Sequence, residues 1–224
     1  DNAQLSLDIK ANRIALSPLM RDLEMSEALS LEGAISATVN GQSRGATVNT
    51  LVEKLDLTAA FNGAEVKLAP INLEQQFCRV VGLINQTETP ERVWDAFTPL
   101  KELSGTITLK EQIVRIERLT AGVEKLLITP TGHINLASDA YDISLPFKLV
   151  SDAANSELST SASGCALGSN YWVEKGLELL RCRGSFASLN PLTDCRPDPA
   201  MLTALTKELA LKALSDKRGI NVDE

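Results

Sequence analysis

The sequence predicts an α+β domain dominated by an antiparallel, twisted β-sheet, with several short helices and a C-terminal helix. Apolar and polar residues alternate through much of the stretch from Leu103 to Val150, which is the pattern of strands with one buried face. Apolar residues at helical spacing occur in shorter stretches on both sides of it. Strands and helices do not alternate regularly along the chain, which argues against an α/β fold with a parallel sheet. A twisted sheet of this kind can curl into a groove.

Length and composition suit one folded unit. The chain has 224 residues, of which 44% are apolar, enough for one large domain or two small ones. We expect a single domain over 1–224. Its parts are a strand and helix lead-in (1–70), a helical segment (71–98), an antiparallel meander (99–190) and a C-terminal helix (198–218).

The charge balance excludes some partners. Lys and Arg number 22 against 29 Asp and Glu, a net charge of −7, so no basic excess exists to displace counterions from nucleic acid. Adsorption to anionic membranes is disfavoured for the same reason. Apolar runs such as Leu126-Leu127-Ile128 are far shorter than the roughly 20 residues of a membrane-spanning helix. The chain opens with Asp1-Asn2-Ala3 rather than with Met and a leader, so we expect any targeting or anchoring segment to have been removed or to lie upstream.

Four elements are predicted in the lead-in. Ser17-Pro18 has the residue types of a helix start, and the helix runs to about Leu29. A strand over Leu31–Val39 ends at the turn-like pair Asn40-Gly41. A short helix over 47–55 follows, and then a strand over 57–68.

Two longer helices are predicted from apolar spacing. Between Asn72 and Gln86 the apolar residues recur on one face of an amphipathic helix, with Cys78 beside that face. A loop with a short helical turn around Trp94 and Phe97 leads to the meander. Asp198-Pro199 begins a C-terminal helix that continues to about residue 217.

The meander is the most regular part of the chain. In its last strand Pro146 cannot donate to a ladder, which predicts a sheet edge or a bulge at that point. Beyond it, Cys165–Phe186 is expected to add one more hairpin. The five predicted meander strands are Gly105–Lys110, Ile113–Leu119, Leu126–Thr129, Gly132–Leu136 and Tyr141–Val150.

The four cysteines favour disulfides in an oxidising compartment. They lack the close CxxC spacing of redox and zinc sites, and with one histidine in the chain no metal site and no cofactor are predicted. The predicted pairs are Cys165–Cys182, which closes a loop worth roughly 3 kcal/mol, and Cys78–Cys195. The alternative is four reduced cysteines packed in the core.

A serine hydrolase is a remote alternative. Gly41-Gln42-Ser43-Arg44-Gly45 matches the G-x-S-x-G pattern between a predicted strand and a predicted helix, and His133 would be the base. The pattern is short and its residues are also ordinary loop residues. The acids Asp139 and Asp142 flank a probable turn and give no specific sign of a glycosidase. We therefore predict no catalytic residues.

Motifs spread over nearly the whole chain are similar to those of one protein family. The most specific is the cysteine arrangement near the C-terminal end, Gly164-Cys165, Arg181-Cys182-Arg183-Gly184-Ser185-Phe186 and Cys195. The others are Leu31-Glu32-Gly33, Asn72–Cys78, Leu103-Ser104-Gly105-Thr106 and Gly132–Leu136. Together they resemble the C-terminal region of the AsmA family, large envelope proteins of Gram-negative bacteria.

The resemblance implies a non-catalytic periplasmic domain tethered to the inner membrane by an upstream helix. Its implied role is outer-membrane biogenesis, with phospholipid transport or lipid homeostasis along a hydrophobic groove and phospholipid acyl chains as the partner. The alternatives are an adaptor that binds envelope proteins, and ordinary core in place of a groove. The groove candidates, taken from the alternating strands, are Ile107, Leu109, Val114, Ile116, Ile134, Leu136, Ile143, Leu145, Phe147 and Leu149.

Overall fold

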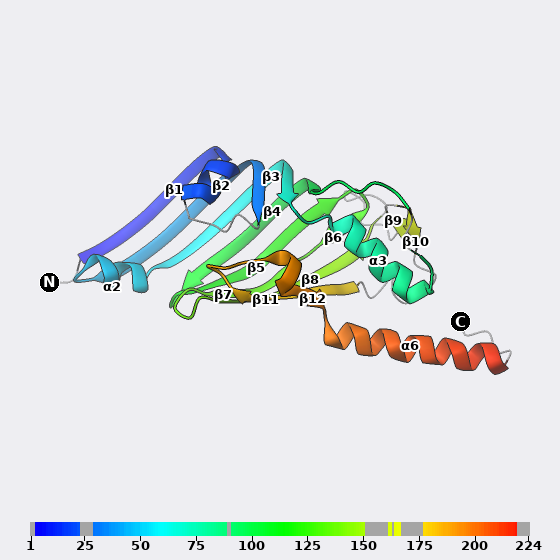
Figure 1. The fold of residues 1–224 in the computed structure, drawn as a ribbon. Coiled ribbons are helices and arrows are strands. Elements are labelled where there is room, and N and C mark those ends of the chain that lie inside the picture. The colour runs from blue at the N-terminus through cyan, green and yellow to red at the C-terminus, as the bar shows by residue number, and fades with distance from the viewer. Residues whose placement is uncertain are drawn as a thin grey trace.

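The fold is that of a computed structural model, which describes residues 3–22, 29–88, 91–150, 161–162, 164–166 and 177–218. Most of its strands form one antiparallel sheet, and the helices lie at its ends and on one face (Figure 1). The strands are β1 (Ala3–Ala15), β2 (Ser30–Gly45), β3 (Asp56–Ala69), β4 (Thr98–Lys110), β5 (Ile113–Val123), β6 (Leu126–Ile128), β7 (Thr131–Asn135), β8 (Ala140–Leu149), β9 (Ser161–Ala162), β10 (Cys165–Ala166), β11 (Leu177–Ser185) and β12 (Cys195–Pro197). The helices are α1 (Leu16–Asp22), α2 (Val48–Glu53), α3 (Leu73–Asn85), α5 (Pro191–Asp194) and α6 (Pro199–Arg218).

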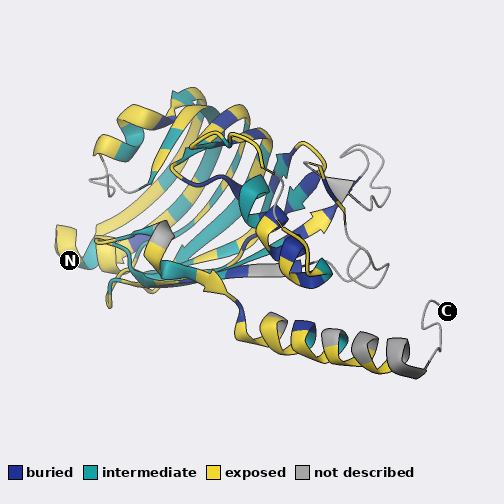
Figure 2. Ribbon diagram, turned by 45° about the vertical axis from the view of Figure 1, so that its right-hand side comes forward, coloured by how far each residue is buried: buried dark blue, intermediate teal, exposed yellow. Residues whose placement is uncertain are grey.

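The predicted fold class is confirmed. The large sheet has the order β1-β2-β3-β4-β5-β6-β8-β11-β12, with β7 bridging β5 and β8 beside β6. Every pairing in it is antiparallel. Strand direction rotates steadily from β1 to β11, as expected for a twisted sheet, and α6 extends away from the body (Figures 1 and 2).

Two predicted helices begin at side-chain caps. The Asn72 side chain accepts a hydrogen bond from the Gln75 backbone N–H at 2.8 Å, and so starts α3. Gln86 ends the helix in the left-handed conformation. Asp198 caps α6 through the Ala200 N–H at 2.7 Å. The helical prediction for 72–86 and for 198–217 is therefore confirmed.

The lead-in differs from the prediction at its turn. Asn40-Gly41 does not end a strand, because β2 continues through it to Gly45 and pairs with β1 on one side and β3 on the other. The two ladders outweigh the turn preference of the pair. The helix at Ser17-Pro18 is present as α1, which ends at Asp22, and positions 23–28 lie outside the described residues.

The segment before β4 is irregular and, over the described residues 91–97, contains no helix. Residues 91–95 have no helical turn, and Trp94 and Phe97 lie on a link that leads into β4. The Asn72 side-chain amide donates to the carbonyls of Asp95 and Phe97 at 3.0 and 3.2 Å. These bonds fix the backbone of the link, so the short helical turn predicted there is wrong.

Of the sheet edge and the bulge predicted for Pro146, the structure shows a local irregularity in the ladder. Pro146 is not in an edge strand, because β8 has partners on both sides. On one side the β8–β11 register shifts between Glu178 and Leu180, next to the position opposite Pro146. On the other side β6 has ended and β7 has not yet begun, and the Pro146 carbonyl accepts from the Thr129 N–H at 3.2 Å. The missing proline N–H therefore interrupts no regular ladder.

The disulfide pairing predicted from the sequence is wrong, although all four cysteines are paired. The structure joins Cys78 to Cys165 and Cys182 to Cys195. The second pair lies directly opposite across the β11–β12 hairpin, with Cα atoms 3.9 Å apart. Of the predicted hairpin over 165–186, positions 167–176 lie outside the described residues, and its two described ends do not pair with each other. Cys165 belongs to β10, which pairs with β9, whereas β11 joins the large sheet.

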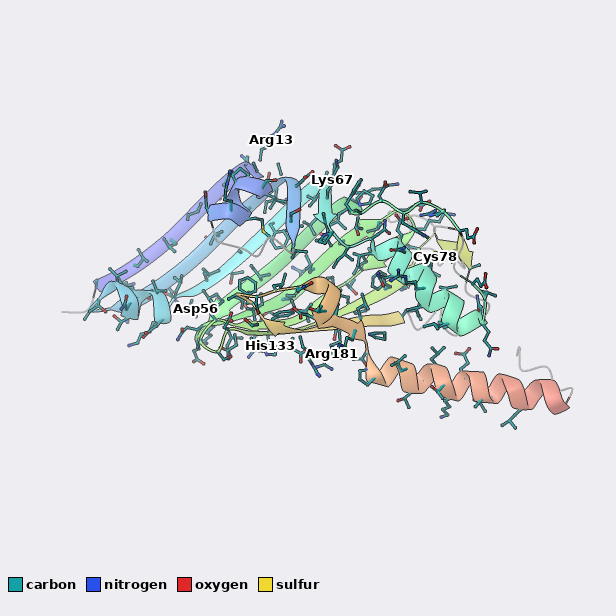
Figure 3. The ribbon with its side chains drawn as sticks, in the orientation of Figure 1. Arg13, Asp56, Lys67, Cys78, His133 and Arg181 are labelled. Atoms are coloured by element: carbon teal, nitrogen blue, oxygen red, sulfur yellow. A yellow bond between two sulfur atoms is a disulfide. The ribbon has the colours of Figure 1, made fainter. Side chains whose placement is uncertain are left out.

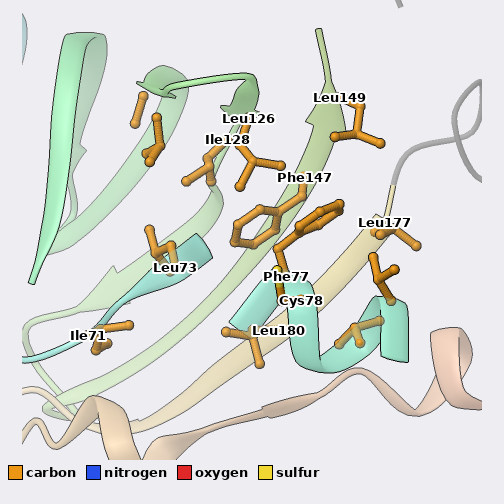
Figure 4. Packing of buried hydrophobic residues seen from close by; sticks show 14 of the residues in the cluster. Ile71, Leu73, Phe77, Cys78, Leu126, Ile128, Phe147, Leu149, Leu177 and Leu180 are labelled. Atoms are coloured by element: carbon orange, nitrogen blue, oxygen red, sulfur yellow. The ribbon is translucent and has the colours of Figure 1, made fainter. Parts of the chain in front are cut away.

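The buried core lies at one end of the sheet, under α3. Phe77, Val81 and Ile84 of this helix are buried in one cluster with residues of β6, β8 and β11, and Figure 4 shows Phe77 beside Phe147. The Cys78–Cys165 disulfide fastens the helix to β10. Asn85 adds a 2.7 Å bond from its side-chain amide to the Ala166 carbonyl. The strand residues of this core are Val66, Leu100, Ala121, Val123, Leu126, Ile128, Phe147, Leu149, Cys165, Leu177 and Leu180.

Candidate functional site

One face of the sheet is apolar from strand to strand. Residues that are opposite each other in an antiparallel ladder place their side chains on the same face. The cross-strand registers therefore form continuous apolar rows across β1 to β5. One such row is Ile9, Val39, Ala59, Ile107 and Ile116.

A parallel row begins one step along the strands. It contains Leu7, Gly41, Leu57, Leu109 and Val114, and it continues through Ile134 of β7. The apolar face continues along the strands because the alternation of buried and exposed residues changes phase at the same level in β3 and in β4. Burial in β3 alternates from Leu57 to Gly63, and after Glu65, which has φ 55°, it resumes one position later at Val66. In β4 the same change of phase separates Leu103 from Leu100.

Most of this face is not part of the core. Near α3 the face joins the core through Ile35, Leu103 and Ala121, whereas the two rows named above are half-buried or exposed and are absent from the buried cluster and from the residues packed against it, as far as the described chain goes. We call this surface the open apolar face. It consists of Leu5, Leu7, Ile9, Ala11, Ala37, Val39, Leu57, Ala59, Phe61, Ile107, Leu109, Val114, Ile116 and Ile134.

The ten groove candidates divide between the two parts of the face. Phe147 and Leu149 are buried under α3, and Leu145 packs against the same cluster. Leu136, just after β7, is 46% exposed, and Ile143 is half-buried. The remaining five, Ile107, Leu109, Val114, Ile116 and Ile134, belong to the open apolar face.

Three strands of the open apolar face were not assigned to it from the sequence. β1 was not predicted at all, although Leu5, Leu7 and Ile9 alternate strictly with polar residues. That alternation was the available signal. The contribution of β2 and β3 depends on register, which is not readable from composition because many of their face residues are alanine or glycine.

The opposite face of the same strands is polar, and in β1 and β3 it is exposed. In β3 it presents Thr58, Ala60 and Asn62, each exposed next to half-buried neighbours. Further along the sheet a polar row runs from Arg115 through His133 to Asp142. Water therefore contacts this side of the sheet, and the apolar side chains are gathered on the other.

The polar row ends in a carboxylate held by two arginines. Asp142 accepts two bonds from the Arg181 guanidinium at 2.8 and 2.9 Å and one from Arg183 at 3.0 Å. Arg181 and His133 are labelled in Figure 3. Arg181, and then Arg183, lower the pKa of Asp142 below its usual value. All three side chains are partly exposed, so this is a surface brace between β8 and β11.

The structure does not bring Ser43 and His133 together. Ser43 is buried in β2, and its hydroxyl donates to the Leu51 carbonyl at 2.5 Å, which holds α2 against the strand. His133 is exposed on β7, and β3, β4 and β5 lie between the two strands. Four strand spacings of about 4.8 Å separate a nucleophile from its proposed base by far more than a hydrogen bond. The arrangement supplies no Ser–His pair.

The described residues show neither a metal-ligand cluster nor a spanning helix. No group of three or more His, Cys, Asp or Glu side chains in this part of the chain is placed to hold a metal ion. Likewise, none of its helices combines the length and the apolar composition needed to cross a membrane. The two disulfides indicate an oxidising, non-cytoplasmic compartment. The open apolar face is thus the main unexplained feature of the molecule.

Comparisons with known proteins do not assign the chain. No family model, no curated protein and no solved structure matches it.

Proposed function

We propose that the open apolar face holds the acyl chains of phospholipid, as part of lipid transport or lipid homeostasis in the periplasm. The observation that carries this proposal is a continuous apolar surface, made by the rows through Ile9 and Leu7, that is left half-exposed while the reverse of the same strands is polar. Apolar faces of sheets are normally covered by their own domain. Large exposed apolar surfaces usually mark a ligand or a partner.

The dimensions and energetics suit an acyl chain. From β1 to β7 the rows cross five strand spacings of about 4.8 Å, or about 24 Å, which exceeds the roughly 15 Å of hydrocarbon in one bilayer leaflet. Each methylene sheltered from water contributes about 0.8 kcal/mol. Small residues such as Ala37, Gly41 and Ala59 keep the middle of the face low, so a chain can lie close to the backbone.

The open apolar face is covered by α3 on one side and uncovered at β1. At α3 the same sheet face is closed by Phe77 and its neighbours, and the helix is fastened by the Cys78–Cys165 disulfide. An acyl chain on the open apolar face therefore has a closed end at β6 and β8 and an open end at β1. The periplasmic setting and a tether to the inner membrane come from the resemblance to AsmA proteins. The oxidising compartment indicated by the disulfides agrees with that setting.

Two adjacent alanines allow a matched test. Ala59 is on the open apolar face and Ala60 on the polar face of the same strand. Ala59→Glu places a charge among the acyl chains, whereas Ala60→Glu places it in water. Phospholipid extracted from the purified protein and quantified by mass spectrometry should fall at least about tenfold in Ala59→Glu, a cost of about 1.4 kcal/mol or more. It should be unchanged in Ala60→Glu.

Circular dichroism and thermal unfolding of both variants show whether the fold is retained. Equal lipid content in the two folded variants would contradict the proposal, as would wild-type protein free of lipid. If Ala59→Glu does not fold, the same comparison is made with Ile9→Glu, at the exposed margin of the face, where a charge is more easily tolerated.

A further inference from the structure

Two neighbouring rows on the polar face of the sheet are rich in arginine. Residues that are opposite each other in the ladders share this face. The first row crosses β4, β5, β7, β8 and β11 and contains Thr108, Arg115, His133, Asp142 and Arg183. The second crosses β7, β8, β11 and β12 and contains Thr131, Ser144, Arg181 and Arg196. We give the name arginine patch to the set Arg115, His133, Arg181, Arg183 and Arg196.

The arginine patch is positive in a chain that is acidic as a whole. Among the described side chains its four arginines face two carboxylates: Asp142, already bound by two of them, and Asp198, which lies 3.8 Å from Arg181. All members of the patch except Arg181 are exposed. The next acid along β5, Glu117, accepts a 2.8 Å hydrogen bond from the Thr108 hydroxyl. The patch therefore keeps positive charge although the chain carries −7.

The register also sets two like charges opposite each other. Arg181 lies directly across from Arg196 on the neighbouring strand. Like charges in this arrangement destabilise a sheet. An anion lying over the patch would remove that cost, and a guanidinium binds the oxygens of a phosphate in pairs.

We propose that the arginine patch docks the chain on the phosphates of an anionic phospholipid bilayer. From β5 to β12 the patch crosses four strand spacings of about 4.8 Å, or about 19 Å, so it can contact several headgroups at once. Each arginine close to an anionic membrane surface strengthens binding. The negative charge elsewhere on the chain opposes this contact less, because salt screens charges that lie more than about 10 Å away.

The composition of the two rows favours a bilayer over a protein partner. Protein interfaces are usually anchored by large apolar or aromatic side chains. No residue of the two rows is apolar, and Thr131 and Ser144 lie among the arginines. The disulfides indicate an oxidising, non-cytoplasmic compartment, where phospholipid headgroups form an extended phosphate surface and nucleic acid is not expected.

Contact through the arginine patch leaves the open apolar face accessible. The two surfaces lie on opposite faces of the sheet and are centred on different strands. A twist of roughly 20–25° per strand accumulates to roughly 100° over the five spacings from β2 to β8 (Figure 1). With β8 and β11 on the bilayer, the apolar side of β2 is thus turned sideways, and acyl chains can reach it.

Vesicle sedimentation tests this inference. At an ionic strength of about 0.05 M the chain should sediment with vesicles of about 30% phosphatidylglycerol in phosphatidylcholine, and not with phosphatidylcholine alone. Raising the ionic strength to about 0.5 M should release it. The two kinds of vesicle are made with the same acyl chains, so lipid uptake by the open apolar face does not distinguish them.

Two double variants with the same change of charge locate the contact. Arg115→Gln with Arg196→Gln leaves both arginines that bind Asp142 in place, and should weaken binding to the phosphatidylglycerol vesicles more than tenfold. Lys10→Gln with Arg44→Gln removes two exposed cations from the polar face of β1 and β2. This control should bind within about twofold of wild type. Circular dichroism shows that both variants fold.

Three results would overturn the inference. They are wild-type protein that does not sediment with phosphatidylglycerol, equal binding to the two kinds of vesicle, and equal losses in the two double variants. A fourth would reassign the patch to an acidic protein. That result is polyglutamate binding which is tighter than vesicle binding at equal negative charge, and which Arg115→Gln with Arg196→Gln abolishes.

Discussion

At the scale of single residues, a hydrogen-bonded carboxylate secures the turn after β11. The Tyr141 hydroxyl donates to Asp194 at 2.6 Å, and the Asn190 N–H donates to the same carboxyl oxygen at 2.8 Å. The bond from Tyr141 is the largest influence that lowers the pKa of Asp194. Burial, and then Asp194, raise the pKa of Tyr141, so the phenol stays a neutral donor.

Tyr141→Phe should lower the free energy of unfolding by about 1.5–3 kcal/mol at pH 7, because it removes a hydrogen bond to a charged group. Because the pKa of Asp194 is lower in the folded than in the unfolded protein, its ionised form stabilises the fold at pH values above the unfolded pKa of about 3.9. This stabilisation is lost as the pH falls through the folded pKa. The difference between Tyr141→Phe and wild type should therefore shrink below about pH 4. Urea unfolding at several pH values measures it. A difference independent of pH would show that Asp194 is not the group involved.

At the scale of elements, β7 depends on a glycine. Gly132 has φ 141°, and a Cβ at this position would lie 2.1 Å from the Asp142 carbonyl oxygen of the neighbouring strand. A side chain here meets both an unfavourable backbone conformation and a fixed backbone atom. The approach of β7 to β8, and with it the place of Ile134 on the open apolar face, requires glycine.

Gly132→Ala should lower the free energy of unfolding by about 2–4 kcal/mol, the sum of a strained φ and a forced backbone shift. Gly122→Ala is the control, because the nearest atom to its Cβ would be 3.7 Å away and its φ is ordinary. We expect it to change stability by less than about 1 kcal/mol. Thermal unfolding of Gly132→Ala and Gly122→Ala measures the difference. Equal melting temperatures of the two variants would contradict the role of Gly132.

The elements also show what a sequence can and cannot predict here. The helix over 72–86 was predictable because apolar residues recur at helical spacing through the whole stretch. The cysteine pairing was not, since it depends on which strands become neighbours: Cys182 is opposite Cys195 because β12 folds back on β11. The candidate face was found where large residues alternate in the meander. Its other half was missed, because Ala37 and Ala59 join it through register alone.

At the scale of the whole molecule, the two disulfides and the buried core lie at the same end. Cys78–Cys165 closes a separation of 87 residues and Cys182–Cys195 one of 13, and neither reaches β1 to β5. By the chain-entropy relation the longer link stabilises the fold by about 4.5 kcal/mol and the shorter by about 3 kcal/mol. β3, β4 and β5 add Val66, Leu100 and Val123 to this core, whereas β1 and β2 contribute no fully buried apolar side chain and are held by their backbone ladders and half-buried side chains.

This uneven fastening has a dynamic consequence. Amide hydrogens of β1 and β2 should exchange with solvent faster than those around Phe147, because local opening needs less free energy where few side chains are buried. Hydrogen exchange followed by mass spectrometry measures the difference, and equal protection in both regions would contradict it. A bound acyl chain would slow exchange in β1 and β2 and raise the melting temperature by mass action. The compliant half of the sheet can then admit and release a ligand by fluctuations that leave the cross-linked half folded.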